Sequence, residues 1–258
     1  MTSVHPPRDR PLHPELERLV AEVLSDVPYG DNPYFRSLRD GSLSHEDFLE
    51  TQLQFHAAVV FFSRPMAVVA SRIEDAALRV EIVRNVWEEH GEGEPSRMHG
   101  ASFETLLGRL AGWTPGEVKA ELARRPLWPE VRAFNTLLVG ACGGDDPLVG
   151  LATLGVIERM FTEISGWLGR GIVERGFVRA EDLVHYDLHE VLDVRHAADF
   201  FVVCGASWDR GTRERERIEA GLRLGAYAFH RLYEDLFAAR ARRWLREEPA
   251  TNARGTRG

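Results

Sequence analysis

The sequence predicts an all-α fold built as a single helical bundle. Nearly all of the chain between its two ends has a helical pattern, and helix-start signals precede several of the segments. Signals for strands are poor, because no Asn-Gly or Asp-Gly hairpin separates alternating apolar runs, and Asp40-Gly41 fits a corner between two helices better. The chain also shows no internal repeat.

The helical stretches are predicted in order, with boundaries good to several residues. They span about 14–26, 33–40, 45–87, 97–111, 115–123, 127–141, 146–175, 180–205 and 209–245. Residues 1–13 are rich in proline and charge and are expected to form a loose arm, and 246–258 a frayed tail, which leaves 14–245 as one domain. Pro65 is expected to kink or divide the third stretch, because proline lacks the backbone N–H that a helix interior uses.

Start signals support several of these helices. Side-chain oxygens of serine, threonine and aspartate accept hydrogen bonds from the first N–H groups of a helix, and proline fits the first turn. The expected signals are Ser44 with Asp47, Thr114 with Pro115 and Glu117, and Asp145 or Asp146 with Pro147.

Composition limits the class of protein. A chain of 258 residues, 44% of them hydrophobic, is long enough to bury a sizeable core. Its net charge of -8 and pI near 5.7 argue against nucleic acid or an anionic membrane as the main partner. Only Cys142 and Cys204 are present, no stretch approaches ~18 uninterrupted apolar residues, and the N-terminus lacks an apolar signal region, so a cytoplasmic location is expected.

One helical segment carries a motif of metal-binding side chains. In HYDLHEVLDVRHAADFF, His189, Asp193 and His196 occur at i, i+4 and i+7, so one helix face carries all three. Imidazole and carboxylate suit iron, manganese or zinc, and the segment is predicted to form half of a metal site in a bundle. A chance grouping on a polar helix face is the alternative. His185 lies one turn earlier, where an exposed helix start is favoured over a hydrogen bond to a ligand.

The other half of such a site needs ligands on facing helices, and Glu89, His99 and Glu158 are the candidates. Glu158 lies in the apolar run PLVGLATLGVIERMF, where a buried carboxylate costs several kcal/mol unless it is paired or binds a cation. Each candidate has an alternative: an exposed stripe with Arg159 and Glu163 for Glu158, a surface or capping role for His99, and a solvated acidic helix end for Glu89.

The order and spacing of these residues resemble one known family. The segment NVWEEHGEGEPSRMH, then Glu158, then HEVLDVRHA resembles the haem-oxygenase-like di-iron oxidases and oxygenases, and DVRHA resembles their aminobenzoate-forming branch most closely. The resemblance covers about 32–240 and implies a haem-oxygenase-like helical bundle. It also implies two sets of iron ligands, namely Glu89, His99 and His196 for one ion, and Glu158, His189 and Asp193 for the other.

The resemblance implies a non-haem di-iron enzyme that activates O2 through a peroxo-diferric species. Its expected substrate is a small amino acid, amine or carboxylic acid of specialised, natural-product metabolism, altered by C–H abstraction, C–C cleavage or N-oxygenation. Both metals are expected to be iron, with manganese or a weakly bound iron as the alternative for the second. Because Gly91-Glu92-Gly93 lacks the third glycine and preceding strand of a nucleotide fingerprint, the reductant is expected to be external. A homodimer is compatible with these expectations.

Two positions depart from the aminobenzoate-forming branch. Those relatives depend on a tyrosine in an early helix and a lysine after the central glutamate, where this chain has Phe35 and Leu168. Tyr34 is adjacent to the first position but is expected to face elsewhere on a helix. Some N-oxygenating relatives carry an additional glutamate ligand at a place that here lies near Ser63. Both aminobenzoate synthesis from the chain's own tyrosine and N-oxygenation are therefore disfavoured.

Candidate substrate-binding residues come from the apolar segment FHAAVVFFSRPM. Arg64 is a candidate clamp for a carboxylate, and His56 a candidate hydrogen-bond donor. An arginine on the surface and a histidine in the core are the respective alternatives.

Three other classes of protein fit the sequence less well. A ferritin-type iron protein uses Glu-x-x-His pairs, and none occurs in the sequence. A zinc hydrolase motif fails because His189-Glu190 is followed by Asp193 where a second histidine is needed. The stronger rival is a metal-independent enzyme of the same fold, of the thiaminase II or pyrroloquinoline-quinone synthase type. Such an enzyme needs no six-ligand set, and thiaminase II needs a reactive cysteine.

Overall fold

The computed structural model describes residues 11–240, apart from the side chains of residues 184 and 187–192. The α-helices are α1 Pro14–Ser25, α2 Pro33–Asp40, α3 His45–Ser71, α4 Ala76–Glu89, α5 His99–Ala111, α6 Pro115–Arg124, α7 Pro129–Val139, α8 Pro147–Glu174, α9 Val184–Trp208 and α10 Thr212–Ala239. Short helical turns are Tyr29–Asp31, Gly91–Gly93, Pro95–Arg97 and Ala180–Asp182, with a π-helical turn at Gly140–Gly144. Residues 11–240 contain no strand, so the all-α prediction is confirmed.

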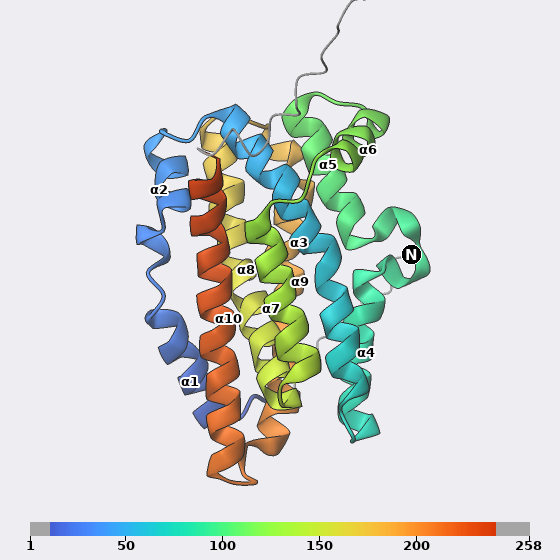
Figure 1. Ribbon diagram of the computed structural model, residues 1–258, viewed down its shortest axis with the longest axis vertical. Coiled ribbons are helices and arrows are strands. Elements are labelled where there is room, and N and C mark those ends of the chain that lie inside the picture. The colour runs from blue at the N-terminus through green and yellow to red at the C-terminus, as the bar shows by residue number, and fades with distance from the viewer. Residues whose placement is uncertain (1–10, 241–258) are drawn as a thin grey trace, which may run out of the picture.

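The long helices run side by side along the bundle, with α8 at its centre (Figure 1). Helix α8 packs most extensively against α9 and α10, while α3 packs against α4, α5 and α7. Helices α1 and α2 cover one side of the bundle, and α4, α5 and α6 stand on the other. The elements that carry the predicted ligands, α4, α5, α8 and α9, therefore meet at the side away from α1 and α2.

Helix α8 is buried on nearly all sides because its sequence is almost entirely apolar or small. Its outward stripe includes Arg159, Glu163, Trp167 and Arg170, and Glu158 lies off that stripe with 4% of its surface exposed. The alternative that placed Glu158 on an exposed stripe is therefore wrong. Where α10 crosses α8, a Cβ at Gly225 would lie 2.5 Å from the Thr153 carbonyl oxygen, so only glycine permits this approach.

The predicted helix starts are confirmed. Ser44 Oγ accepts a hydrogen bond from the Asp47 N–H at 3.0 Å. Asp146 accepts one from the Leu148 N–H, also at 3.0 Å. Thr114 and Glu117 form a reciprocal capping box at the start of α6, in which Thr114 Oγ1 and the Glu117 carboxylate each accept a backbone N–H.

The long third stretch divides at a different place from the one predicted. Helix α3 continues through the buried Pro65, and the chain breaks instead at Arg72–Asp75 before α4. Asp75 starts α4 by accepting a hydrogen bond from the Ala77 N–H at 2.8 Å. One lost backbone hydrogen bond at Pro65 is outweighed by packing of the surrounding helix, whereas an aspartate cap favours a new helix start.

Two further expectations concern the ends of the chain and the absence of a membrane-spanning segment. The arm and the tail lie largely outside the described residues, so the division into arm, domain and tail stays a prediction. By length and composition, α3 is the one described helix that is apolar enough to cross a membrane, and 61% of its apolar window is buried within the bundle. That burial is typical of a core helix.

Candidate metal centre

Four helices bring the predicted ligands to one place. Glu89 is the last residue of α4 and His99 the first of α5, while Glu158 lies midway along α8 and His196 lies in α9. Ligand atoms of Glu89, Glu158 and His196 all lie within 4.8 Å of one another, and these three side chains are buried. His99 Nδ1 contacts the Glu89 carboxylate directly. These four side chains therefore surround one point between the helices.

The two remaining predicted ligands are both on α9. Asp193 is fully buried, and its charge interacts with those of His196, His99 and Glu89. His189 lies on α9, but its side chain is outside the part of the chain that the structure describes. Its role, and the division of the six residues between two ions, stay predictions.

The tight connection between α4 and α5 brings Glu89 and His99 together. Two short turns, Gly91–Gly93 and Pro95–Arg97, connect the two helices within ten positions. Gly91 has φ +63°, and a Cβ there would lie 2.6 Å from the Arg97 carbonyl carbon. The glycine at position 91 therefore permits the close packing of this connection, which keeps Glu89 and His99 in contact.

The cluster has unsatisfied polar atoms that point to a cation. Glu158 Oε1 and His196 Nδ1 are buried and have no hydrogen-bond partner among the described residues. His196 Nδ1 lies 3.8 Å from Glu158 Oε1 and 3.6 Å from Glu89 Oε1, which is too far for a hydrogen bond. Buried carboxylate and imidazole atoms that face one another at this spacing fit a shared metal ion.

The electrostatics of the cluster agree with that fit. Burial raises the pKa of Glu158 well above its usual value, and the charge of Asp193 adds to the effect. Burial likewise raises the pKa of Asp193 to about 7. Burial alone would lower the pKa of His196, but its hydrogen bond to Glu88 and three nearby carboxylates raise it to about 10. Several buried carboxylates at one point repel each other, and a divalent cation would relieve that repulsion.

Glu88 fixes the orientation of His196. Its Oε2 atom lies 3.0 Å from His196 Nε2, which turns Nδ1 toward Glu89 and Glu158. Arg195 also pairs with Glu88, and Asn85 donates a hydrogen bond to the His196 carbonyl oxygen at 3.2 Å. Burial alone raises the pKa of Glu88, but the hydrogen bond and charge of His196, with Arg195, lower it overall. A carboxylate behind a histidine ligand is a frequent arrangement at metal sites.

We predict that Glu88→Ala weakens iron binding by roughly 10- to 100-fold, because His196 loses the partner that fixes its ring. Glu88→Gln retains an acceptor and should lose less affinity. Anaerobic ferrous titration measures both. Glu94→Ala, an exposed change in the same acidic segment, is the matched control and should bind like the unchanged protein. Equal affinity in all four proteins would show that Glu88 does not position His196.

His185 is a further buried histidine beside the cluster. The expected exposed position is wrong, since the side chain is fully buried and its Nδ1 lies 2.9 Å from Ser102 Oγ. Its ring centroid lies 5.6 Å from that of His99 and 4.6 Å from that of Phe103. His185 therefore packs behind His99.

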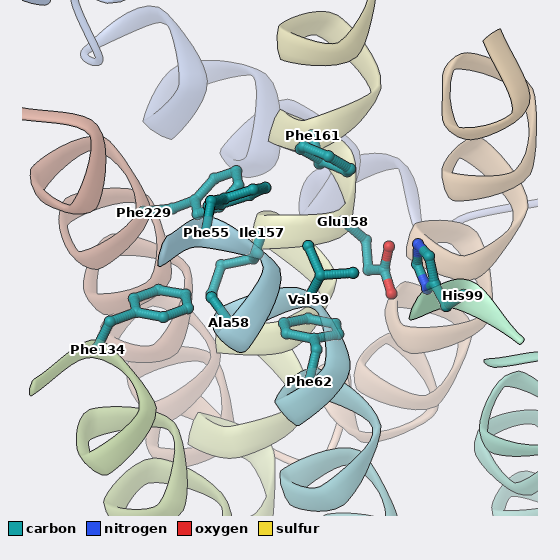
Figure 2. A pocket seen from close by; sticks show the side chains of 10 residues that line it. All are labelled: Phe55, Ala58, Val59, Phe62, His99, Phe134, Ile157, Glu158, Phe161 and Phe229. Atoms are coloured by element: carbon teal, nitrogen blue, oxygen red, sulfur yellow. The ribbon is translucent and has the colours of Figure 1, made fainter. Parts of the chain in front are cut away.

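An apolar pocket adjoins the cluster (Figure 2). Its volume is about 40 Å³. His99 and Glu158 point toward one another at one end, and phenyl rings fill the other. The other lining residues within the described part of the chain are apolar: Phe55, Ala58, Val59, Phe62, Phe134, Ile157, Phe161 and Phe229.

The two predicted substrate-binding residues lie elsewhere on α3. Arg64 is exposed, with its guanidinium carbon 5.6 Å from the centre of the Phe61 ring. His56 faces α5, where its Nε2 lies 3.7 Å from Glu104 Oε1. Neither residue lines the pocket. Their roles in substrate binding stay predictions.

His56 predicts a specific pH dependence of stability. Burial lowers its pKa to about 4, and its side chain is 12% exposed. The unfolded chain takes up the His56 proton near pH 6.5, so the folded protein loses at most about 3 kcal/mol as pH falls from 6.5 to 4. The neutral variant His56→Gln should lack this loss. Urea unfolding of both proteins between pH 7 and 4 measures it, and parallel pH profiles would contradict the prediction.

The chain matches one family along most of its length. The sequence model for the family described as iron-containing redox enzymes matches residues 49–230. A 4-aminobenzoate synthase of Chlamydia muridarum is 25% identical over 176 residues, covering 66% of this chain and 69% of that protein. A 4-aminobenzoate synthase of Chlamydia trachomatis serovar D is 25% identical over 170 residues, covering 66% of this chain and 70% of that protein.

Solved structures share the fold. A CADD-like protein of unknown function from Nostoc punctiforme has a TM-score of 0.72 at 14% identity, covering 88% of this chain and 99% of that one. A domain of unknown function with a haem-oxygenase-like fold from Shewanella denitrificans has a TM-score of 0.67 at 12% identity, covering 90% of this chain and 92% of that one. A TenA homologue from P. horikoshii has a TM-score of 0.64 at 15% identity, covering 87% of this chain and 97% of that one. The predicted haem-oxygenase-like bundle is confirmed.

Proposed function

This chain belongs to the family of iron-containing redox enzymes, and from that premise we propose that it is a non-haem di-iron oxygenase acting on a small organic substrate in the cytoplasm. The observation that carries the proposal is the buried group of Glu89, Glu158 and His196, in which Glu158 Oε1 and His196 Nδ1 have no hydrogen-bond partner among the described residues. The family match makes iron the metal of choice for this donor set.

Six of these residues would bind the metal ions, and Glu88 would orient one of the ligands. Glu89, His99 and His196 would hold one iron, and Glu158, His189 and Asp193 the other. When bound, two ferrous ions supply electrons to reduce O2. Glu88 keeps the His196 ring in the orientation needed to bind through Nδ1. The apolar pocket beside Glu158 excludes bulk water from the substrate. The electrons would come from a reductant outside this chain.

We propose a substrate other than the chain's own tyrosine, although 4-aminobenzoate synthases are among its relatives. Phe35 and Leu168, which stand at the places of the branch's tyrosine and lysine, are buried apolar residues. Tyr34 is fully buried, and its hydroxyl is hydrogen-bonded to Thr51 and Gln52. None of these side chains lines the pocket at Glu158.

A metal-independent activity of the thiaminase II type is the alternative, since a TenA homologue shares the fold. That activity needs a reactive thiolate. Cys142 and Cys204 are both fully buried, and burial raises the pKa of each thiol to about 12. Protonated thiols without access to solvent disfavour this alternative.

The test is an anaerobic ferrous titration followed by rapid mixing with O2. The expected result is saturation near two irons per chain and a transient visible absorption band. Glu158→Ala and His189→Ala should lose the band and bind less iron, because each removes one proposed ligand. Glu163→Ala, on the outward stripe of α8, is the matched control and should retain both. A chain that takes up no specific iron would overturn the proposal and favour the metal-independent class.

A further inference from the structure

A second cavity lies between α2 and α8, on the side of the bundle away from the candidate metal centre (Figure 1). Its volume is about 210 Å³, compared with about 40 Å³ for the pocket at Glu158. Its walls come from α2, α8 and the turn Tyr29–Asp31. None of the described residues that line it belongs to the ligand group or to that pocket. A molecule bound in this α2–α8 cavity would therefore not touch the metal.

Aromatic side chains form one wall of the α2–α8 cavity. Phe35 is buried, whereas Trp167 is 38% exposed. Their ring centroids lie 6.1 Å apart with the planes at 79°. Tyr29 packs edge-on against Trp167 as well, with the centroids 5.7 Å apart and the planes at 89°. Two rings thus hold the indole in place, and its open surface suits contact with another flat ring.

Two guanidinium groups stand at the same cavity without a carboxylate partner. Arg39 comes from α2 and Arg170 from α8. Within residues 11–240 as described, neither forms an ion pair, and Arg39 makes only a long hydrogen bond, from Nη2 to the Gly30 carbonyl oxygen at 3.4 Å. Both side chains therefore retain donors that can bind an acidic group, which guanidinium recognises well.

The neighbouring acidic residue does not neutralise these arginines. On the same helix, Arg159 and Glu163 are four positions apart and form an ion pair at 3.4 Å. Arg170 and Glu174 have the same spacing and both line the cavity, but no ion pair joins them among the described contacts. Two guanidinium groups against one carboxylate leave one net positive charge at the cavity, in a chain whose net charge is -8. The lining therefore favours an anion over a cation.

The volume limits the size of that anion. Benzene is held by a cavity of roughly 150 Å³, so about 210 Å³ has room for one ring with a small substituent but not for a nucleotide. The floor is closed, because a Cβ at Gly171 would lie 2.8 Å from Leu38 Cδ2. The side at the Tyr29–Asp31 turn is open, because an added Cβ at Gly30 has nothing within 4 Å.

We propose that the α2–α8 cavity is a binding site for a single-ring aromatic carboxylate. The ring packs against Trp167 and Phe35, and the carboxylate accepts hydrogen bonds from Arg39 and Arg170. This site is separate from the one that carries the proposed function, and binding there requires no metal.

The inference is tested by calorimetric titration of the metal-free full chain with phenylacetate. Phenethylamine, which has the same ring but a positive charge, should bind at least about tenfold more weakly because it faces the two arginines. Hexanoate, which has the charge but no ring, should bind about fivefold more weakly because it lacks the contact with the indole.

Glycine variants locate binding in the cavity. Gly30→Leu places a side chain in the open space and should lower the affinity for phenylacetate at least about tenfold. Gly116→Leu is the matched control, because an added Cβ there also has nothing within 4 Å and the residue is in α6. It should bind phenylacetate like the unchanged chain. Circular dichroism of both variants reports that they are folded.

Charge variants test the role of the arginines. Arg170→Gln should lower the affinity about three- to fivefold, since the group is exposed and partly screened by solvent. Glu174→Gln should raise it by a similar factor, because a like charge is removed. Arg36→Gln, an exposed change on α2 outside the lining, is the control and should have no effect.

Nuclear magnetic resonance of the indole N–H groups identifies the contact directly. The Trp167 signal, assigned by its loss in Trp167→Phe, should shift as phenylacetate is added. No shift of this signal, phenethylamine binding as tightly as phenylacetate, unchanged affinity in Gly30→Leu, or no binding of phenylacetate would each overturn the inference. Because these titrations use metal-free protein, none of the results depends on the outcome of the ferrous titration.

Discussion

Replacing Glu158 by leucine is expected to stabilise the metal-free protein while abolishing its response to iron. Glu158 is 4% exposed, and its Oε1 has no hydrogen-bond partner among the described residues. A hydrophobic side chain of similar volume removes a costly buried polar group, so the free energy of unfolding should rise by about 1–3 kcal/mol. In contrast, iron at about 100 times its dissociation constant should stabilise only the unchanged chain, by about 2.7 kcal/mol.

Anaerobic thermal unfolding with and without ferrous iron measures both effects. The matched control is Glu163→Leu, on the same helix, where the side chain is 42% exposed and its ion pair with Arg159 is worth at most about 1 kcal/mol. This control should keep the response to iron. A metal-free Glu158→Leu protein that is less stable than the unchanged chain would mean that the carboxylate has a structural partner in the fold.

Gly225→Ala is expected to destabilise the bundle by about 3 kcal/mol, or on the order of 10 °C in Tm. The added Cβ would meet the Thr153 carbonyl oxygen and Val156 Cγ1, each at 2.5 Å, so α10 must move away from α8. Because Glu158 lies on α8 between buried neighbours, the same displacement should also weaken iron binding. Urea unfolding and ferrous titration of the variant measure the two effects.

The control for this variant is a glycine in open space. Gly116, in α6, has nothing within 4 Å of an added Cβ. Gly116→Ala should therefore stabilise the protein by about 0.5 kcal/mol, because alanine loses less backbone entropy in a helix. Destabilisation of equal size in both variants would show that the close approach of α10 to α8 does not determine the cost.

The presence of the helices and the positions where most of them begin could be predicted, because both depend on interactions between residues close in the sequence. The caps at Ser44, Thr114 and Asp146 form as their sequences indicate. The division of residues 45–87 could not be placed, because Pro65 is a strong local signal that packing in the bundle overrides. The weaker signal was Asp75, an aspartate before a helical run, which could have located the true break.

The grouping of Glu89, Glu158 and His196 could be anticipated only in part, because spacing shows which residues share a helix face but not which helices meet. Glu158 was recognisable as a carboxylate out of place in an apolar run, and the structure joins it to Glu89 and His196. Glu88 was missed because an acidic cluster at a helix end normally faces solvent. Only the approach of α9 reveals that it holds His196. The residues that line the pocket could not be predicted from the sequence either, since Phe134 and Phe229 come from helices that are far apart along the chain.

The walls of the pocket and the ligand group draw on largely different helices. Among the described side chains, the apolar lining comes from α3, α7, α8 and α10, whereas the candidate ligands come from α4, α5, α8 and α9. A mutation at Phe62, Phe134 or Phe229 can therefore reshape the pocket without displacing a ligand. During divergence from a common ancestor, such an arrangement lets the substrate change through mutations in the lining while the candidate ligands are retained.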